Sequence, residues 1–248
     1  METTSSRPHL FGLLAGLFLA AGLAFASLVL ARTWTHLKES QIIDVTGSAQ
    51  KHIRSDLAIW QGHFSVEAES LLDANAQLKA DLAKTEAFLR AKGVKDYALL
   101  PVQIREVTQR VRDDESGETV AKRVGYQLTQ AVEVRSTDVE SAPRLSRDCT
   151  DLLEQGVAMV SDGIQFLYTQ AGQAKVEMMA EATKDARTRA EQIARQGARE
   201  VSNLRSARMG VVQINPRYST ATSWEGNNDT TALEKTIIVT VSAEFALR

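Results

Sequence analysis

The chain has 248 residues, of which 44% are hydrophobic and 24% are charged, and its formal net charge is −2. This is the composition of an ordinary globular protein, long enough for one large domain or two small ones. The slight negative charge provides no basic surface for nucleic acid, and aromatic residues, at 6%, are too sparse to predict a platform that stacks bases. The single cysteine, Cys149, excludes an intrachain disulfide and is expected to be a small buried side chain.

Residues 10–31 form an uncharged apolar run that follows a short tail at residues 1–9. The run is long enough to cross a bilayer as a helix, which takes about 20 residues. Trp34 stands just beyond it, where an interfacial aromatic residue is expected. A cleaved signal peptide is the alternative, because the Ala-Phe-Ala sequence at residues 24–26 resembles a cleavage site. Since the apolar run continues beyond that site, we favour an uncleaved anchor.

The orientation of this segment depends on the charges that flank it. Arg7 precedes the run, and Arg32 and Lys38 follow it, so the positive charges on the two sides are almost balanced. Because the tail before the run is so short, we expect the tail to stay in the cytoplasm. The rest of the chain would then be exported, joined to a single membrane-spanning helix.

The body that follows a polar stalk at residues 32–41 mixes strand and helix patterns. Apolar and polar residues alternate, as in β-strands, at residues 42–49, 57–68, 100–112, 120–135, 164–169, 207–214 and 233–245. Helices are expected from Ser70 to Gly93, from Asp138 or Ser141 to near Gly156, and over residues 174–197. Turns at residues 52–56 and 162–163 and polar loops at residues 113–119 and 215–231 join these elements.

This order of elements predicts an α+β fold: an N-terminal transmembrane helix, then a domain over residues 42–248 of antiparallel strands covered by about three helices. In the strand at residues 57–68, the apolar face carries Ala58, Trp60, Gly62, Phe64, Val66 and Ala68. In the first helix, Ser70 is expected to act as the N-cap, with Asp73 three residues on. The buried stripe of that helix is expected to contain Leu71, Leu78, Leu82, Thr85 and Leu89.

The segment at residues 174–197 has a clear helical period and is rich in alanine. Its buried face is expected to contain Val176, Met179, Ala180, Thr183, Ala186, Ala190, Ile193, Ala194 and Gly197. Small residues let a helix lie close against a sheet or another helix, and the opposite face is charged. We therefore expect this helix to pack and to carry no chemistry.

Patterns of catalytic, cofactor-binding or metal-binding residues are absent from the sequence. His52 and His63 have no partner at zinc-ligand spacing, and no nucleophile, phosphate-loop or dinucleotide motif occurs. The acidic run at residues 113–115 lacks the spacing of a calcium loop and is expected to be a solvated hairpin end. We therefore predict a protein without catalytic residues, cofactor or metal.

Tyr218 and Trp224 are the unusual residues of the polar loop at residues 215–231. Exposed aromatic side chains on a long loop can anchor a protein or a membrane partner. The alternative is that they pack over the end of a sheet. We take Tyr218 and Trp224 as candidate partner-contact residues.

Several short patterns occur in a characteristic order along the body. They are I-x-V-x-G at Ile43, Val45 and Gly47, D-x-A at residues 56–58, Gly93-Val94, Gly125-Tyr126, and A-x-x-D-A-x-x-x-A at residues 182–190. In this order, and over residues 42–248, the chain resembles the SIMPL-domain family of bacterial envelope proteins.

The resemblance implies an α+β fold and an exported or membrane-anchored periplasmic protein linked to tolerance of oxidative and envelope stress. Some members assemble into ring-like or channel-like homo-oligomers, and the family has no accepted catalytic residues. The expected location is therefore the bacterial inner membrane, with most of the chain in the periplasm. Cleavage of the N-terminal segment would instead give a soluble periplasmic protein.

Three functions follow as hypotheses. The first is a non-enzymatic, membrane-anchored envelope protein that self-associates as a scaffold or ring and supports stress tolerance. The second is a module that binds a small molecule or lipid near Tyr218 and Trp224. The third, an enzyme whose site no motif reveals, is disfavoured because no nucleophile–base or metal spacing is visible.

Overall fold

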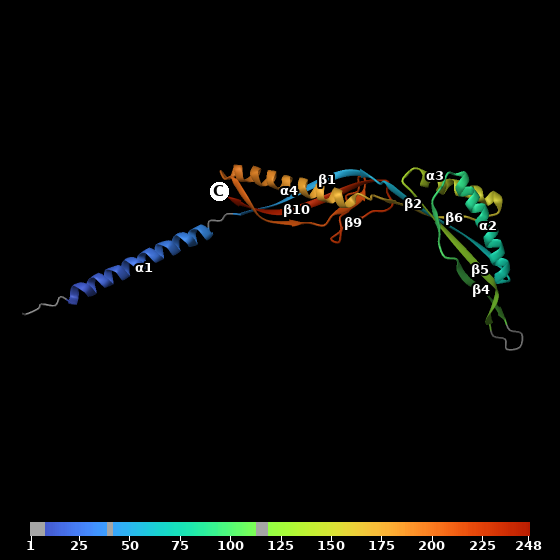
Figure 1. Cartoon of the computed structure of the whole chain (residues 1–248), viewed down its shortest axis with the longest axis horizontal. Helices are drawn as coiled ribbons and strands as arrows, with labels where there is room; N and C mark the ends of the chain where they lie inside the picture. The colour runs from blue at the N-terminus through green and yellow to red at the C-terminus, as the bar shows by residue number, and fades with distance from the viewer. Residues whose placement is uncertain (1–7, 39–41, 113–118) are drawn as a thin grey trace, which may run out of the picture. The chain divides into compact units, whose positions relative to one another are not determined.

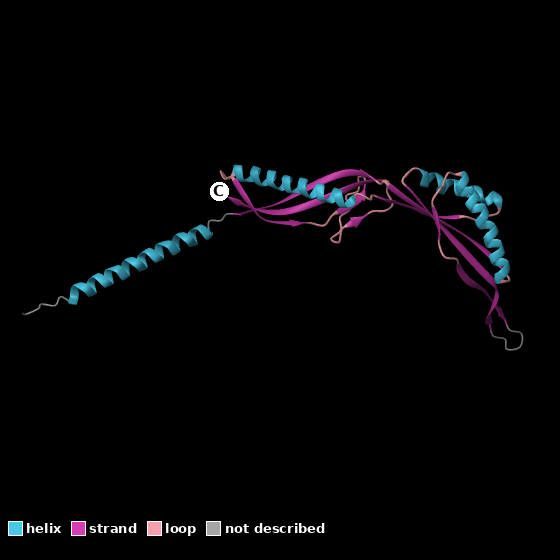
Figure 2. Cartoon of the chain, viewed as in Figure 1, coloured by secondary structure: helices cyan, strands magenta, loops and turns pink. Residues whose placement is uncertain are grey.

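The computed structural model describes residues 8–38, 42–112 and 119–248. An N-terminal apolar helix is followed by mainly antiparallel sheets and, in the described part, three further α-helices (Figures 1 and 2), which confirms the predicted α+β class. Two compact units form: unit 1 is Met1–Ser48, Ala180–Gly210 and Thr240–Arg248, and unit 2 is Ala49–Met179 and Val211–Val239. Strands β1 (Ile42–Arg54) and β10 (Glu234–Leu247) and helix α4 (Ala171–Gln196) supply residues to both units.

Helix α1, Pro8–Lys38, contains the predicted membrane segment. Its stretch Gly12–Trp34 has a mean hydropathy of 2.4, and no part of that stretch is buried. An exposed helix of this length and composition fits a membrane anchor or a signal peptide. The helix also continues into the residues expected to form the stalk, where Thr33 Oγ1 donates a hydrogen bond to the carbonyl oxygen of Val29 at 2.9 Å.

The main sheet of unit 2 is organised around strand β2, Leu57–Ala68. It pairs in antiparallel fashion with β5 (Thr119–Ser136) on one side and β6 (Val160–Leu167) on the other. Strands β3 (Tyr97–Leu99) and β4 (Gln103–Arg112) also pair with β5. The acidic run at residues 113–115, which was expected to be a hairpin end, lies outside the described residues.

One face of this sheet forms the core of unit 2. Trp60 lies opposite Val134 and Val66 lies opposite Leu128, and all four side chains are buried. The predicted apolar face of the strand is therefore confirmed. Helix α2 (Leu71–Ala91), helix α3 (Ser141–Asp148) and the 3₁₀ helix η1 (Cys149–Gln155) supply the other residues of this core, including the buried Cys149.

The ends of α2 follow from its sequence. Ser70 Oγ accepts a hydrogen bond from the Asp73 N–H at 3.1 Å, as predicted for an N-cap. Gly93 follows the helix with a φ of +80°, a conformation that glycine adopts without strain. Leu78, Thr85 and Leu89 are buried as expected, but Leu71 is 41% exposed. That prediction was wrong because Leu71 opens the helix, before its buried stripe begins.

Two expected turns are parts of strands instead. The turn predicted at residues 52–56 was placed too early, because β1 extends to Arg54 in its pairing with the long strand β10. The predicted Asp162-Gly163 turn lies inside β6. Gly163 has a φ of +116°, and the pairing with β2 changes register beside it, between Gln61 and Gly62. This glycine therefore makes a β-bulge rather than a chain reversal.

The strand expected at residues 207–214 is divided in two. Strand β7, Val201–Met209, pairs with the unit 1 part of β10, and strand β8, Gln213–Pro216, pairs with its unit 2 part. In unit 2, β8 also pairs in parallel with the short strand β9, Asn227–Asn228.

The sheet of unit 1 has three strands in the order β1-β10-β7. It packs against the second half of α4, which runs beside β1 and β10 in Figure 1. The predicted alanine helix is present, but its buried stripe recurs strictly every fourth residue: Ala174, Met178, Ala182, Ala186, Ala190 and Ala194. Val176 and Ile193, expected to be buried, are 62% and 57% exposed, and Ala180 is also exposed. The prediction used steps of three and four, whereas the buried stripe advances by four and turns by about 40° at each step, so Val176, Ala180 and Ile193 fall outside it.

Candidate partner-contact site

The loop that carries Tyr218 and Trp224 connects β8 to β9 in unit 2. It leaves the sheet at Pro216, whose carbonyl oxygen accepts a hydrogen bond from the Ser219 N–H at 3.0 Å. Between them, Tyr218 has a φ of 69°, a left-handed conformation that is uncommon for a bulky side chain. The loop returns at Gly226, with a φ of +95°, where a Cβ would lie 2.7 Å from the Val211 side chain.

Three amide side chains from the two strands hold the loop backbone. Gln213 Nε2 donates to the Ser223 carbonyl oxygen at 2.7 Å, and Gln213 Oε1 accepts from the Asn227 N–H at 3.0 Å. Asn215 Nδ2 donates to the Ala221 carbonyl oxygen at 2.6 Å. Asn227 Nδ2 donates to Asn215 Oδ1 at 2.9 Å and so joins the two strands. Since Gln213 and Asn215 are buried, these bonds replace the backbone pairing that an irregular loop lacks.

The held loop presents both aromatic side chains to solvent. Tyr218 is 83% exposed and Trp224 is 84% exposed. The guanidinium of Arg217 lies 5.0 Å from the centre of the Tyr218 ring, in cation–π contact. Neither aromatic ring therefore packs over the end of a sheet, which was the alternative expected from the sequence. Large exposed aromatic groups on a backbone fixed in advance are suited to contact with a partner.

The comparisons with known proteins bear on the whole body. A family model described as "SIMPL: Protein of unknown function (DUF541)" matches residues 43–245. The chain belongs to the SIMPL family. No curated protein matches the chain. The resemblance inferred from the short patterns is thus confirmed. The matched residues, which we call the SIMPL body, include strands and helices of both units and the aromatic loop of unit 2.

The two histidines of the SIMPL body make polar contacts within unit 2. His52 lies in β1, not in a turn, and its Nδ1 is 3.0 Å from Thr236 Oγ1. His63 Nδ1 is 2.8 Å from a carboxylate oxygen of Asp162. Among the described residues, no group of three or more His, Cys, Asp or Glu side chains is placed to hold a metal ion.

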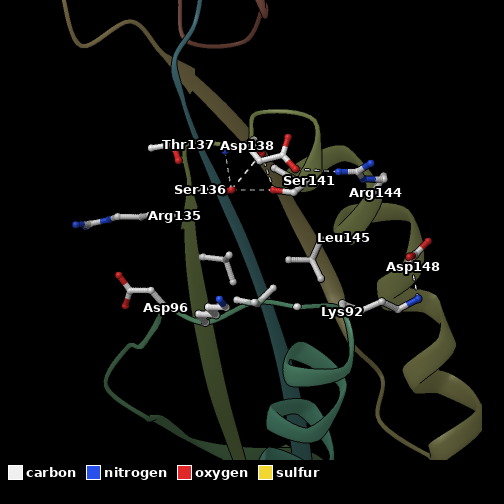
Figure 3. A pocket seen from close by; sticks show the side chains of 15 residues that line it. Lys92, Asp96, Arg135, Ser136, Thr137, Asp138, Ser141, Arg144, Leu145 and Asp148 are labelled. Carbon is white, nitrogen blue, oxygen red and sulfur yellow. Dashed lines mark hydrogen bonds and ion pairs between the residues drawn. The ribbon is translucent and has the colours of Figure 1, made fainter.

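A cleft of about 550 Å³ lies in unit 2 where α2 ends, β5 ends and α3 begins (Figure 3). Val94, Val134 and Leu145 contribute apolar surface to it. Charged and hydroxyl side chains complete the lining: Lys92, Lys95, Asp96, Arg135, Ser136, Thr137, Asp138, Ser141, Arg144 and Asp148. Neither Tyr218 nor Trp224 lines this cleft, so a ligand held here would not touch the aromatic loop.

Ion pairs neutralise much of the charge around this cleft. Lys92 Nζ donates to Asp148 at 2.8 Å and to Asp151 at 3.2 Å, and Arg144 Nη2 lies 2.9 Å from Asp138. The hydrogen bond from Lys92 lowers the pKa of Asp148, and the same bond raises the pKa of Lys92. The cleft is therefore an amphipathic surface on which much of the charge is already paired within the chain.

Sequence reasoning missed a buried lysine in β10 of the SIMPL body. Lys235 is 2% exposed; its Nζ donates to the carbonyl oxygen of Phe166 at 2.6 Å and also to that of Asp229. Burial lowers the pKa of Lys235, and the nearby Asp229 carboxylate opposes this effect. Its hydrogen bonds tie β10 to β6 and to the loop before β10. The sequence did carry a signal for its burial: Lys235 stands two residues before the buried Ile237, and alternate residues of a strand share a face.

Proposed function

We propose that this SIMPL protein is a non-enzymatic, membrane-anchored scaffold of the bacterial envelope whose body binds further copies of itself. The observation that carries the proposal is the exposure of strands β4 and β7. Only Val107 is partly buried in β4, and only the first two residues of β7 are. A strand contributes to stability by burying at least one face, and neither strand does so within one chain.

Apolar side chains are prominent on these open strands. Ile104 on β4 is 59% exposed, and Val111 near the end of β4 is 40% exposed. On β7, Leu204 is 47% exposed and Met209 is 51% exposed. Apolar residues gathered on exposed strands mark contact surfaces, because covering them removes apolar area from water. A scaffold that presents such surfaces needs partners, and copies of itself are always available.

Association tests this proposal directly. Two differently tagged full-length chains would be produced together and extracted from the membrane with a mild detergent, and one tag would be captured. We expect the second tag to co-purify in stoichiometric amounts. Recovery of the captured chain alone, at protein concentrations in the micromolar range, would remove the self-association on which the scaffold depends.

The anchor and the body take separate places in this proposal. Helix α1 would remain uncleaved in the inner membrane and the body would lie in the periplasm, with a cleaved signal peptide as the alternative. Protease added to spheroplasts should digest the body if this orientation is right. The link to oxidative and envelope stress is carried over from the family resemblance, and loss of tolerance after deletion would be its test.

The aromatic loop supplies a second surface, for a partner of another kind. Tyr218 and Trp224 protrude from a backbone that buried amides hold in place. We propose that they contact a protein or lipid partner of the envelope. Crosslinking from a photoreactive residue at position 224 in cells would identify that partner; adducts equally frequent from an exposed control position would count against it.

A lipid- or small-molecule-binding module is the second candidate, favoured by the amphipathic cleft beside α3. An acyl chain would lie on Val94 and Leu145 while the polar lining meets a head group. Titration with a fluorescent fatty acid should then saturate. The Thr137→Trp variant, which places a bulky ring at an exposed position of the lining, should abolish that binding. Equal binding by the variant and the unaltered chain would exclude this cleft.

A further inference from the structure

The sheet of unit 1 has two open edges. Strand β10 lies in the middle and pairs with β1 on one side and β7 on the other. No other described strand pairs with β7 or with the outer edge of β1. An open edge presents backbone N–H and C=O groups that another strand can bond. Which residues present them follows from the hydrogen bonds of the neighbouring positions.

On β1, the open edge is marked by Ser48. Its N–H donates to Asp185 Oδ2 of α4 at 2.8 Å, which places that N–H on the side away from β10. Backbone groups alternate in direction along a strand, so the groups of Asp44 and Thr46 also point to the open edge. Asp185 occupies the edge at Ser48 itself, and no other described side chain bonds the edge at Asp44 or Thr46.

On β7, the register with β10 gives the corresponding positions. The Gly210 N–H donates to the Thr240 carbonyl oxygen at 2.9 Å, and two residues earlier Arg208 lies opposite Ser242. In an antiparallel ladder every second pair exchanges hydrogen bonds, so Arg208 bonds toward β10. Ala207 and Met209, between such pairs, therefore point their N–H and C=O groups to the open edge.

The two edges fit each other in parallel pairing. β10 runs antiparallel to β7, and it returns from unit 2 to unit 1 while β1 runs the opposite way, so β1 and β7 share a direction. In a parallel ladder, one residue bonds the two neighbours of the residue beside it. We propose that β1 of one copy pairs with β7 of a second copy, with Asp44 bonding Ala207 and Met209. This interface rests on the proposed self-association and specifies it.

Side chains on one face of the sheet agree with this register. Thr46 Oγ1 is 3.2 Å from Ser242 Oγ, so these residues share the face away from α4. Asp44 lies on that face because it is two residues from Thr46, and Arg208 because it is opposite Ser242. Neither Asp44 nor Arg208 has an ion-pair partner among the described residues. Across the junction, the acid of one copy meets the arginine of the next.

On the other face, apolar surfaces would cover each other. Leu204 lies opposite Phe245 and Met209 opposite Val241, which places both on the α4 side although each remains about half exposed. Ile193 of α4 is four residues after Arg189, whose guanidinium contacts Ser48 of β1, so it lies on the β1 flank of the helix. The second copy's Ile193, which is 57% exposed, would thus approach the open side of β7.

A second copy is the occupant that this geometry selects. Parallel pairing gives all copies one direction, so Ile42, which starts β1 after the apolar helix, lies at the same end of every copy. Anchors at one end suit copies that share a membrane. The contact joins two different surfaces, so it repeats from copy to copy and closes into a ring or extends as a filament.

Charge reversal tests the interface in the full chain, by light scattering in detergent. Asp44→Arg and Arg208→Asp should each weaken association at least about tenfold, because like charges would face each other across the junction. The double variant should restore the native mass of the unaltered chain. Single variants that associate like the unaltered chain would overturn this interface and leave self-association standing. A monomeric unaltered chain would instead contradict the proposed function.

A disulfide test fixes the pairing of the edges. In one chain these edges lie on either side of β10, so a chain carrying both Asp44→Cys and Arg208→Cys cannot close a bond within itself. With diamide as oxidant, the double variant should give a ladder of linked chains, and each single variant should give none. Linked dimers from either single variant would show pairing of like edges and overturn the proposal. Cys149 is present in every variant and is buried, so the unaltered chain, which has only this cysteine, should form no links.

Discussion

Gly47 of β1 lies directly against Ala182 of α4. A Cβ added to Gly47 would stand 2.1 Å from the carbonyl oxygen of Ala182 and 2.3 Å from the amide nitrogen of Ala186. These are backbone atoms, so no side-chain rotation can make room. The alanine stripe of the helix and this glycine thus act together, because both let the helix axis approach the sheet of unit 1 closely.

Gly47→Ala should therefore destabilise unit 1. The added methyl group forces the helix away from the sheet, and overpacking of this kind costs about 1–3 kcal/mol. Denaturant unfolding of the full chain in detergent would measure the loss. Gly172→Ala is the matched control, because nothing lies within 4 Å of a Cβ there and alanine favours a helix. Equal stability of Gly47→Ala and the unaltered chain would contradict the close packing.

The packing of α4 also shows which features of this helix could be predicted from the sequence and which could not. The small-residue period predicted a helix that lies close to a sheet or to another helix, and in the structure its second half lies on the sheet of unit 1. The period alone did not give the stripe itself: the buried residues recur at every fourth position, which turns the stripe by about 40° at each step. Val176 and Ile193 were assigned to the core as large apolar residues, but Val176 lies about 200° around the helix from the buried Ala174, Ile193 lies beside the stripe, and both are exposed. Which side of a helix meets the sheet along its length is a tertiary property, which one segment does not encode.

Removal of the Asn215 amide should loosen the aromatic loop. Asn215→Ala removes the short hydrogen bonds to the Ala221 carbonyl oxygen and the Asn227 amide and leaves these two groups only their mutual bond of 3.4 Å, at a cost of about 1–3 kcal/mol. Unfolding by denaturant measures that cost, and limited proteolysis should show faster cleavage within the loop. Asn75→Ala on the exposed side of α2 is the control and should change stability by only a few tenths of a kcal/mol. Unchanged proteolysis of Asn215→Ala would contradict the amide network.

Trp224→Ala should leave the fold intact and remove one tryptophan that solvent can reach. Since the side chain is 84% exposed, stability should change by less than about 0.5 kcal/mol. Quenching of tryptophan emission by acrylamide should fall, because one exposed tryptophan is lost; of the two that remain, Trp60 is 1% exposed and Trp34 belongs to the apolar helix, which detergent covers. Trp60→Ala, in contrast, should cost about 3–5 kcal/mol. A large stability loss in Trp224→Ala would show that this ring packs against the body.

Lys235→Met should destabilise unit 2 by about 1–3 kcal/mol at neutral pH, because the carbonyl oxygens of Phe166 and Asp229 lose a buried donor. The pKa of Lys235 is lowered in the folded state, so the unfolded chain binds this proton more tightly. The stability advantage of the unaltered chain should therefore grow as pH rises toward the ordinary value of 10.5 and be smallest below the folded pKa.

Denaturant unfolding of both proteins at pH 7 to 10 checks this pH dependence. Lys79→Met on the exposed side of α2 is the control and should follow the unaltered chain at every pH. A constant difference in unfolding free energy between Lys235→Met and the unaltered chain across this range would contradict the lowered pKa of Lys235.

The candidate sites were only partly open to prediction. Tyr218 and Trp224 were found because large aromatics in a polar loop stand out locally. The amides that hold the loop were not, since Gln213 and Asn227 are fourteen positions apart and their bond depends on the fold. The cleft joins residues near position 94 to others near 140, and the open edges of β1 and β7 emerge only from the strand order. Such relationships are non-local and carry no short pattern.

The native mass of the full chain in detergent, measured by light scattering across micromolar concentrations, tests the central claim most directly. We expect a discrete assembly whose protein mass is a multiple of 27.2 kDa. A protein mass of 27.2 kDa at every concentration would contradict it.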